Sequence, residues 1–138
     1  MSKLQATTPT CIEKENVIRV LVQGKSKDLG GFSVRRVLPA PLARAVGPFV
    51  FVDEMGPADF SPGQGINVRP HPHIGLATVT FLLEGEIMHR DNLGFVQAIQ
   101  PGAVNLMTAG KGIVHSERTA PELLQNGQRL HGMQVWMA

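Results

Sequence analysis

The chain has 138 residues, about the size of one domain. Its 43% hydrophobic and 17% charged residues exclude a disordered protein, and a formal charge of +2 without a basic cluster argues against direct nucleic-acid binding. Cys11 is the only cysteine, which excludes a disulfide-stapled secreted domain. Because no apolar run approaches the roughly 18 residues of a membrane span, we expect a soluble cytoplasmic protein without membrane contacts.

The predicted elements are short strands separated by turns. Residues 1–16 are polar and aperiodic, which predicts a flexible N-terminal arm ahead of a single domain at residues 17–138. Runs of β-branched, aromatic and other apolar residues predict strands at 17–22, 32–37, 49–53, 76–83, 86–89, 95–99 and 130–137. The glycines and prolines of residues 56–72 predict a long surface connection, residues 91–94 a hairpin turn, and residues 121–125 the one helix.

The number and spacing of these elements predict the fold class. Fifteen glycines and ten prolines without a repeat period favour many turns over long helices. Short strands that recur about every 8–12 residues are typical of an all-β sandwich or barrel. We therefore expect an all-β fold with very little helix.

Two pairs of side chains indicate a metal site. His71 and His73 are two residues apart, as are His115 and Glu117. Residues i and i+2 of a strand point to the same face, so each pair can converge on one ion. Three imidazoles and one carboxylate suit a redox-capable divalent metal, whereas the missing thiolate makes a structural zinc site less favoured.

The other histidines favour structural roles. His89 precedes the predicted turn, and we expect it to be exposed or to stabilise the hairpin. His131 alternates with Met133 and Val135, which predicts a core histidine on their face of the strand.

The spacing around the two pairs resembles that of the cupins. Gly65, His71, His73 and Gly85 fit the first cupin motif, and Gly112 and His115 fit the second. The glutamate expected shortly after the second histidine is absent, because Ala77 and Thr78 stand there. The resemblance implies a single cupin barrel, also called a double-stranded β-helix or jelly roll.

Longer blocks make the chain similar to one cupin family, the pirins, over residues 31–137. The blocks are GFSVRR at 31–36, GPF at 47–49, RPHPH at 69–73, LEG at 83–85, MHRD at 88–91 and MTAGKGIVHSER at 107–118. Pirins are longer, with two cupin barrels, so the similarity implies an N-terminal cupin domain without the second one. The chain is then a fragment or a one-barrel relative.

The pirin resemblance implies a ligand set and an activity. Pirins bind a metal, usually iron, through residues that correspond to His71, His73, His115 and Glu117, the set that the spacing also indicates. We expect one divalent ion, Fe²⁺ first, with Zn, Mn, Ni, Co and Cu left open. The implied activity is that of a quercetin 2,3-dioxygenase acting on a small aromatic, flavonol-like substrate, with Glu117 as the catalytic base.

Two further expectations concern partners. Some pirins resemble regulators, so the alternative is a non-enzymatic, metal-dependent module that binds a transcription factor or a metabolic enzyme. The apolar side chains of residues 130–137 predict a homodimer, because a large exposed apolar patch is unusual on a soluble monomer.

Overall fold

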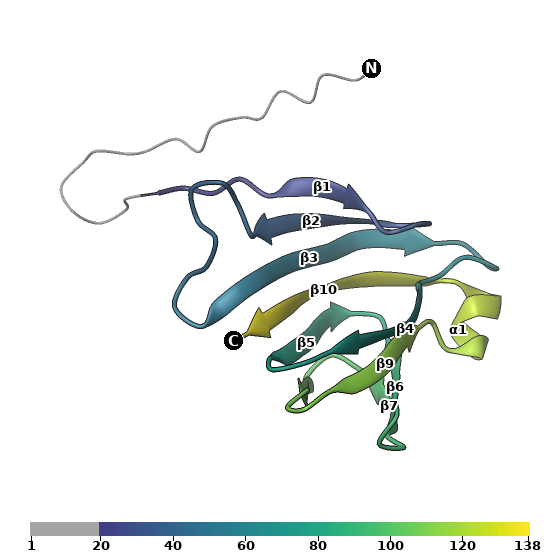
Figure 1. The fold of residues 1–138 in the computed structure, drawn as a ribbon. Coiled ribbons are helices and arrows are strands. Elements are labelled where there is room, and N and C mark those ends of the chain that lie inside the picture. Colours follow the sequence, from purple (N-terminus) through teal and green to yellow (C-terminus); the bar gives the residue numbers. More distant parts are fainter. Residues whose placement is uncertain (1–19) are drawn as a thin grey trace.

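The computed structural model describes residues 20–138, which fold into two antiparallel sheets and one short helix (Figure 1). The larger sheet has the order β1 (Lys25–Asp28), β2 (Ser33–Leu38), β3 (Phe49–Phe60), β10 (Gln128–Met137), β5 (Ala77–Glu84) and β8 (Val104–Thr108). The smaller sheet has the order β4 (Asn67–His73), β9 (Ile113–Arg118), β6 (Ile87–Asp91) and β7 (Val96–Ile99). The helix α1 (Pro121–Asn126) connects β9 to β10. No helix among the described residues is long and apolar enough to cross a bilayer.

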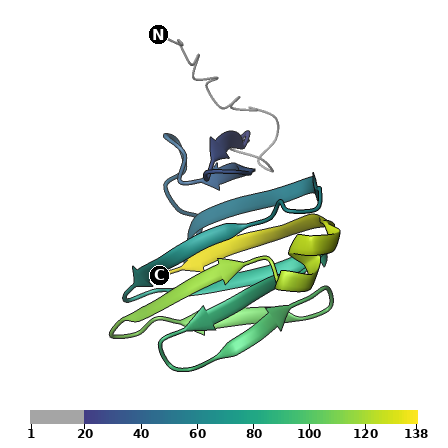
Figure 2. The same cartoon turned by 90° about the vertical axis from the view of Figure 1, so that its right-hand side faces the viewer.

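The two sheets face each other as layers, and β1 and β2 extend the larger sheet past the smaller one (Figure 2). Alternation of side chains along each strand defines an inner and an outer face. In β5, for example, Thr78, Thr80 and Leu82 are buried between the layers, whereas Val79 and Phe81 alternate with them on the outer face.

An apolar core fills one end of the space between the sheets. Leu130 at the start of β10 pairs with Ala58 near the end of β3, so this end lies on the side of α1. The core consists of buried side chains from both sheets and their connections: Val34, Met55, Phe60, Ile66, Leu82, Ile87, Ile99 and Leu130. A smaller buried cluster, Met107, Ala109 and Ile113, lies around the β8–β9 turn.

Polar side chains occupy the interior next to this core. On the larger sheet Gln134 pairs with Asp53 on one side and with Thr80 on the other, and Thr80 pairs with Asn105. This row is largely buried and faces the smaller sheet. Polar groups inside a sandwich are stable only where they find partners, so the row points to a site between the sheets.

The structure confirms the predicted all-β class with very little helix, and α1 lies where the helix was expected. The predicted surface connection over residues 56–72 is wrong, because β3 runs to Phe60 and β4 begins at Asn67. Pro70 and Pro72 lie in β4, an edge strand of its sheet, where a missing N–H costs no ladder hydrogen bond. Gly56 lies in a bulge of β3, where Gly56 and Pro57 oppose the single residue between Leu130 and Gly132 of β10. The predicted strand at 17–22 is also wrong in its described part, since residues 20–22 are not in a strand, and the arm at 1–16 lies outside the described residues.

Candidate metal centre

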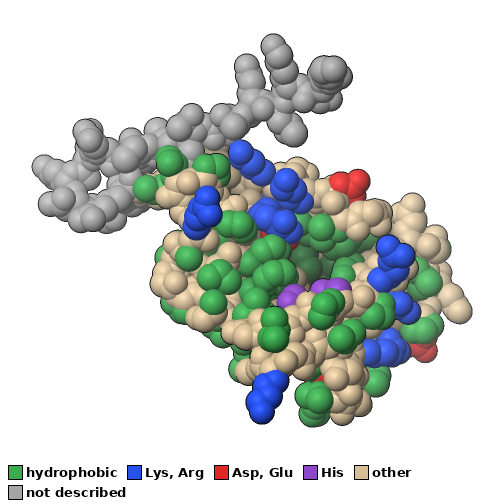
Figure 3. Space-filling view, in the orientation of Figure 1, with side chains coloured by type: hydrophobic (Ala, Val, Ile, Leu, Met, Phe, Trp, Pro, Cys, Tyr) green, Lys and Arg blue, Asp and Glu red, His purple; other side chains and the backbone are tan. Residues whose placement is uncertain are grey.

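Three histidines meet on the inner side of the smaller sheet. His71 on β4 is directly opposite His115 on β9, and His73 follows two residues later on β4. Each offers a ring nitrogen within 4.8 Å of the others, and the ring centroids are 4.5–4.9 Å apart. His73 and His115 are buried and His71 is partly exposed. Histidine side chains are visible inside a hollow bordered by hydrophobic side chains (Figure 3).

The ring nitrogens of this cluster have the spacing of metal ligands. The Nε2 atoms of His73 and His115 are 3.0 Å apart. Two neighbouring ligands that each bind one ion at about 2.0–2.1 Å are separated by about 3 Å when they subtend a right angle. His71 donates its Nδ1–H to the carbonyl oxygen of Arg69 at 2.9 Å, which leaves its Nε2 free to bind.

Glu117 lies next to the cluster but is held by the opposite sheet. Gln134 donates from Nε2 to both carboxylate oxygens at 3.0 Å, and Thr80 donates from Oγ1 to Oε1 at 3.4 Å. Glu117 groups with His115 and His89 within 4.8 Å, not with all three clustered histidines. The structure therefore brings His71, His73 and His115 together and places Glu117 beside them through His115.

The prediction that His89 is exposed is wrong, whereas its contact with Asp91 beside the β6–β7 turn agrees with the alternative, a role in stabilising the hairpin. Its exposed fraction is 2%, and it lies directly opposite Glu117 in the β6–β9 pair. Its Nδ1 is 3.4 Å from Nδ1 of His115, and its Nε2 is 3.2 Å from Oδ2 of Asp91. In the sequence, the spacing of His89 two residues after the apolar Ile87 indicates the same face of the strand, and Ile87 is also buried.

His131 shares the strand face of Met133 and Val135, as predicted, but that face is not the core. Its side chain is partly exposed, and its Nε2 lies 3.4 Å from Oε1 of Glu54. Leu130 and Gly132 are the buried residues on either side of it, so His131 points away from the interior.

Burial controls the protonation of the cluster. It lowers the pKa of His115 to about 3, helped by the charges of His71, His73 and His89, and together with His71 it lowers the pKa of His73. Burial raises the pKa of Glu117, against the lowering effect of the hydrogen bonds from Gln134. Imidazoles whose pKa burial lowers, beside a buried carboxyl group, are a donor set that fits a divalent cation. The positive charge of the cation would favour the ionised form of the carboxyl group, which burial disfavours.

An aromatic column forms one wall beside the cluster. The guanidinium Cζ of Arg36 lies 4.4 Å from the ring centroid of Phe51, which stacks on Trp136 at 4.0 Å. Trp136 meets His73 edge to face at 4.9 Å. Asp53 accepts two hydrogen bonds of 2.8 Å from Arg36, which raise the pKa of the guanidinium and fix it over the column.

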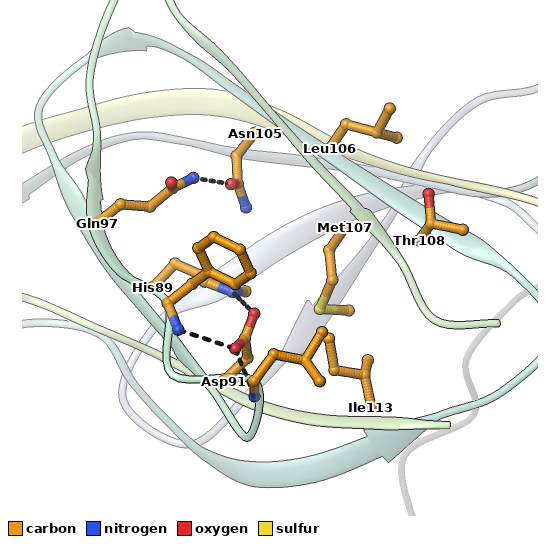
Figure 4. Close-up of a pocket in the computed structure, with 10 residues that line it drawn as sticks. His89, Asp91, Gln97, Asn105, Leu106, Met107, Thr108 and Ile113 are labelled. Carbon is orange, nitrogen blue, oxygen red and sulfur yellow. Dashed lines mark hydrogen bonds and ion pairs between the residues drawn. The ribbon is translucent and has the colours of Figure 1, made fainter. Parts of the chain in front are cut away.

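A cavity of about 180 Å³ borders the other side of the site (Figure 4). His89 and Asp91 form part of its wall, and Gln97 donates to Asn105 across it. Most of the remaining lining is apolar and includes Met107 and Ile113.

Comparison with known proteins identifies the family. The family model for pirin matches residues 31–137. The chain belongs to the pirin family. A pirin-like protein of Caulobacter vibrioides is 54% identical over 124 residues, which cover 88% of this chain and 43% of the relative. The resemblance drawn from the sequence is therefore confirmed.

Solved pirin structures share the fold. A quercetin 2,3-dioxygenase from Acinetobacter baumannii is 44% identical with a TM-score of 0.77, over 84% of this chain and 38% of that one. A bacterial pirin from Escherichia coli, in complex with nickel(II), is 24% identical with a TM-score of 0.67, over 83% of this chain and 48% of that one. The predicted cupin fold is thus confirmed, and the chain spans less than half the length of these relatives.

Proposed function

We propose that this domain binds one divalent metal ion, with iron as the expected ion, through His71, His73, His115 and Glu117. The observation that carries the proposal is the convergence of three imidazoles, with two Nε2 atoms 3.0 Å apart. Glu117 follows His115 by two residues on β9 and has no cationic partner among its hydrogen bonds. Zn, Mn, Ni, Co and Cu remain compatible with such a set of ligands.

We propose further that the domain supports oxidation of a flavonol-like substrate of the quercetin 2,3-dioxygenase type. A bound divalent ion supplies electrostatic stabilisation of the deprotonated flavonol and its reactivity toward dioxygen. The column of Phe51 and Trp136 offers an aromatic surface beside His73 against which a planar ring can stack. The Acinetobacter relative named quercetin 2,3-dioxygenase supports this function over a purely regulatory one.

In this reaction Glu117 acts as the base. Its carboxylate would leave the ion and accept the hydroxyl proton of the substrate, while Gln134 and Thr80 stay bonded to it. Because burial raises the pKa of Glu117, the carboxylate released from the ion is a stronger base than an exposed one. The buried setting also keeps water from the proton transfer.

Metal analysis tests the ligand set. Protein purified without added metal should contain one equivalent of a divalent ion, and His73→Ala should lose most of it. His131→Ala is the matched control, because His131 lies on the outer side of β10 away from the cluster. A full equivalent retained by His73→Ala would contradict the proposed site.

Oxygen consumption tests the activity separately. Iron-loaded protein should consume dioxygen when quercetin is added, and Glu117→Gln should lower the rate by about 100-fold or more, the range lost with a general base. If the protein binds the metal but consumes no dioxygen with quercetin, the ligand set stands and the proposed activity does not.

A further inference from the structure

A chain of hydrogen bonds leads from His115 through His89 to Asp91. His115 Nδ1 lies 3.4 Å from His89 Nδ1, and His89 Nε2 lies 3.2 Å from Asp91 Oδ2. The side chains of His115, His89 and Asp91 are all buried. They come from two paired strands, in which Asp91 is directly opposite His115 and His89 directly opposite Glu117.

One arrangement of protons fits the whole chain. Asp91 accepts through Oδ1 from the backbone N–H groups of Leu93 at 2.9 Å and Phe95 at 3.2 Å, so it is present as an acceptor. Its Oδ2 then accepts from His89 Nε2–H, and in the neutral imidazole the other nitrogen, Nδ1, carries no proton. That bare Nδ1 accepts from His115 Nδ1–H, and His115 Nε2 is left bare in turn.

The bare nitrogen of His115 is the one that faces the cluster, because its partner across 3.0 Å is Nε2 of His73. The two nitrogens of an imidazole lie on different edges of the ring. An ion held between His71, His73 and His115 therefore binds Nε2 of His115, and His89 faces the other nitrogen. The second grouping, of His89 with His115 and Glu117, is close enough to hold an ion as well, and an ion there would take Nδ1 of His89 because its Nε2 is engaged by Asp91.

We propose that His89 and Asp91 are positioning residues that fix the Nδ1–H tautomer of His115 and so present its Nε2 to the metal. This inference rests on the proposed metal site and adds two residues that do not ligate. A metal-bound histidine that donates its other N–H to a carboxylate is held in one orientation and becomes a better ligand. Here the carboxylate acts through an intervening imidazole, whereas for His71 the carbonyl of Arg69 accepts directly.

The tautomers can be read directly in the metal-free protein. Long-range ¹H–¹⁵N correlation spectra of ¹⁵N-labelled protein at neutral pH should show His115 as the Nδ1–H form and His89 as the Nε2–H form. In Asp91→Asn the side-chain oxygen still accepts from the N–H groups of Leu93 and Phe95, and the amide NH₂ takes the place of Oδ2. The NH₂ group donates, so Nε2 of His89 must accept from it. His89 should then change to the Nδ1–H form and His115 to the Nε2–H form. Observation of the Nε2–H form of His115 in the wild type would overturn the proposal.

Titration with Ni²⁺ alone gives the second readout. Loss of an outer partner of a metal ligand costs about 10- to 100-fold in affinity, and we expect a loss of that size for Asp91→Asn and His89→Leu. His89→Asn should lose less, because its side-chain oxygen lies near the position of Nδ1 and still accepts from His115. His131→Leu, the matched control, should bind within about twofold of the wild type.

The outcomes separate the two proposals. If His73→Ala loses the metal but Asp91→Asn binds Ni²⁺ within twofold of the wild type, the positioning role is wrong and the ligand set stands. If His89→Asn and His89→Leu lose equal affinity while both remain folded by circular dichroism, acceptance by His89 is not what matters and the proposal falls. If the wild type binds no Ni²⁺, both proposals fall.

Discussion

At the scale of single residues, the site depends on burial that disfavours the protonated forms of His73 and His115. Burial lowers the pKa of His115 to about 3 and also lowers that of His73. A proton therefore does not compete with a metal for these nitrogens at neutral pH. The same burial raises the pKa of Glu117, which Gln134 and Thr80 stabilise only through neutral hydrogen bonds.

Asp91 should make the stability of the metal-free protein depend on pH. Burial alone would raise its pKa, but hydrogen bonds from His89, Phe95 and Leu93 outweigh burial and lower it. A carboxyl group with a lowered native pKa stabilises the fold fully above its unfolded value of 3.8, and this stabilisation is lost as the pH falls through the native pKa. Asp91→Asn removes this titration, so its unfolding free energy should depend less on pH in acid than that of the wild type.

Urea denaturation at a series of pH values from neutral to acid measures this difference. The gap between wild type and Asp91→Asn should narrow as the solution becomes more acid. Two parallel curves would show that Asp91 gains nothing from its hydrogen bonds.

The sequence could predict the histidine cluster but not what surrounds it. Spacing by two residues on a strand identifies the pair His71 and His73 and the pair His115 and Glu117, since one strand is enough to align each pair. Contacts such as Gln134 with Glu117 cross from one sheet to the other, and no spacing along the chain encodes how two sheets pack. A histidine just before a turn is typical of an exposed position, whereas the alternation of His89 with Ile87 indicates the buried face of the strand.

At the scale of elements, β10 connects the site to the core. It pairs with β3 and β5 in the middle of the larger sheet and carries Leu130 at one end and Trp136 at the other. The register of β10 with β3 shifts between Leu130 and Gly132, because β3 bulges at Gly56 and Pro57. The pattern of the sequence predicted β10 and its pairing partners as strands, but not this bulge. Gly56 and Pro57 are typical of a loop in the sequence because turns and bulges use the same residues.

Gly56 should tolerate substitution less well than another glycine of similar backbone shape. Gly56 has φ of 76° and Gly63 has φ of 83°, so a side chain strains both backbones alike. A Cβ on Gly56 would overlap the carbonyl oxygen of Leu130, whereas a Cβ on Gly63 meets nothing within 4 Å. We expect Gly63→Ala to cost about 1–2 kcal/mol of unfolding free energy. Gly56→Ala should lower the unfolding free energy by a further amount of about 1–3 kcal/mol, the range for overpacking.

Thermal and urea unfolding of the two variants check this expectation. Equal losses would mean that backbone strain alone decides the effect and that β10 moves aside where it faces the bulge of β3.

At the scale of the whole molecule, the outer face of the larger sheet is largely apolar across β3, β10, β5 and β8. An antiparallel sheet with one face in water usually alternates apolar with polar residues. Here the outer face carries a continuous set of apolar side chains in register across β3, β10, β5 and β8: Val52, Val135, Val79, Leu106, Met133, Phe81 and Val104. Val104 and Leu106 are 67% and 59% exposed, so nothing in residues 20–138 covers this end of the face.

We expect this chain to form a homodimer through that outer face. A second copy is the available cover for the face in a solution of this chain alone, and a two-fold contact lets each copy present the same residues to the other. A specific contact should bury more than about 1,000 Å² in total, which a face four strands wide can supply.

Light scattering at micromolar concentration should therefore give about twice the 14.9 kDa mass of one chain. Leu106→Glu should halve that mass, because it buries a charge in the contact, whereas Leu93→Glu, in the exposed β6–β7 turn, should leave it unchanged. A wild-type mass near 14.9 kDa would show that water tolerates the outer face and that the dimer does not form.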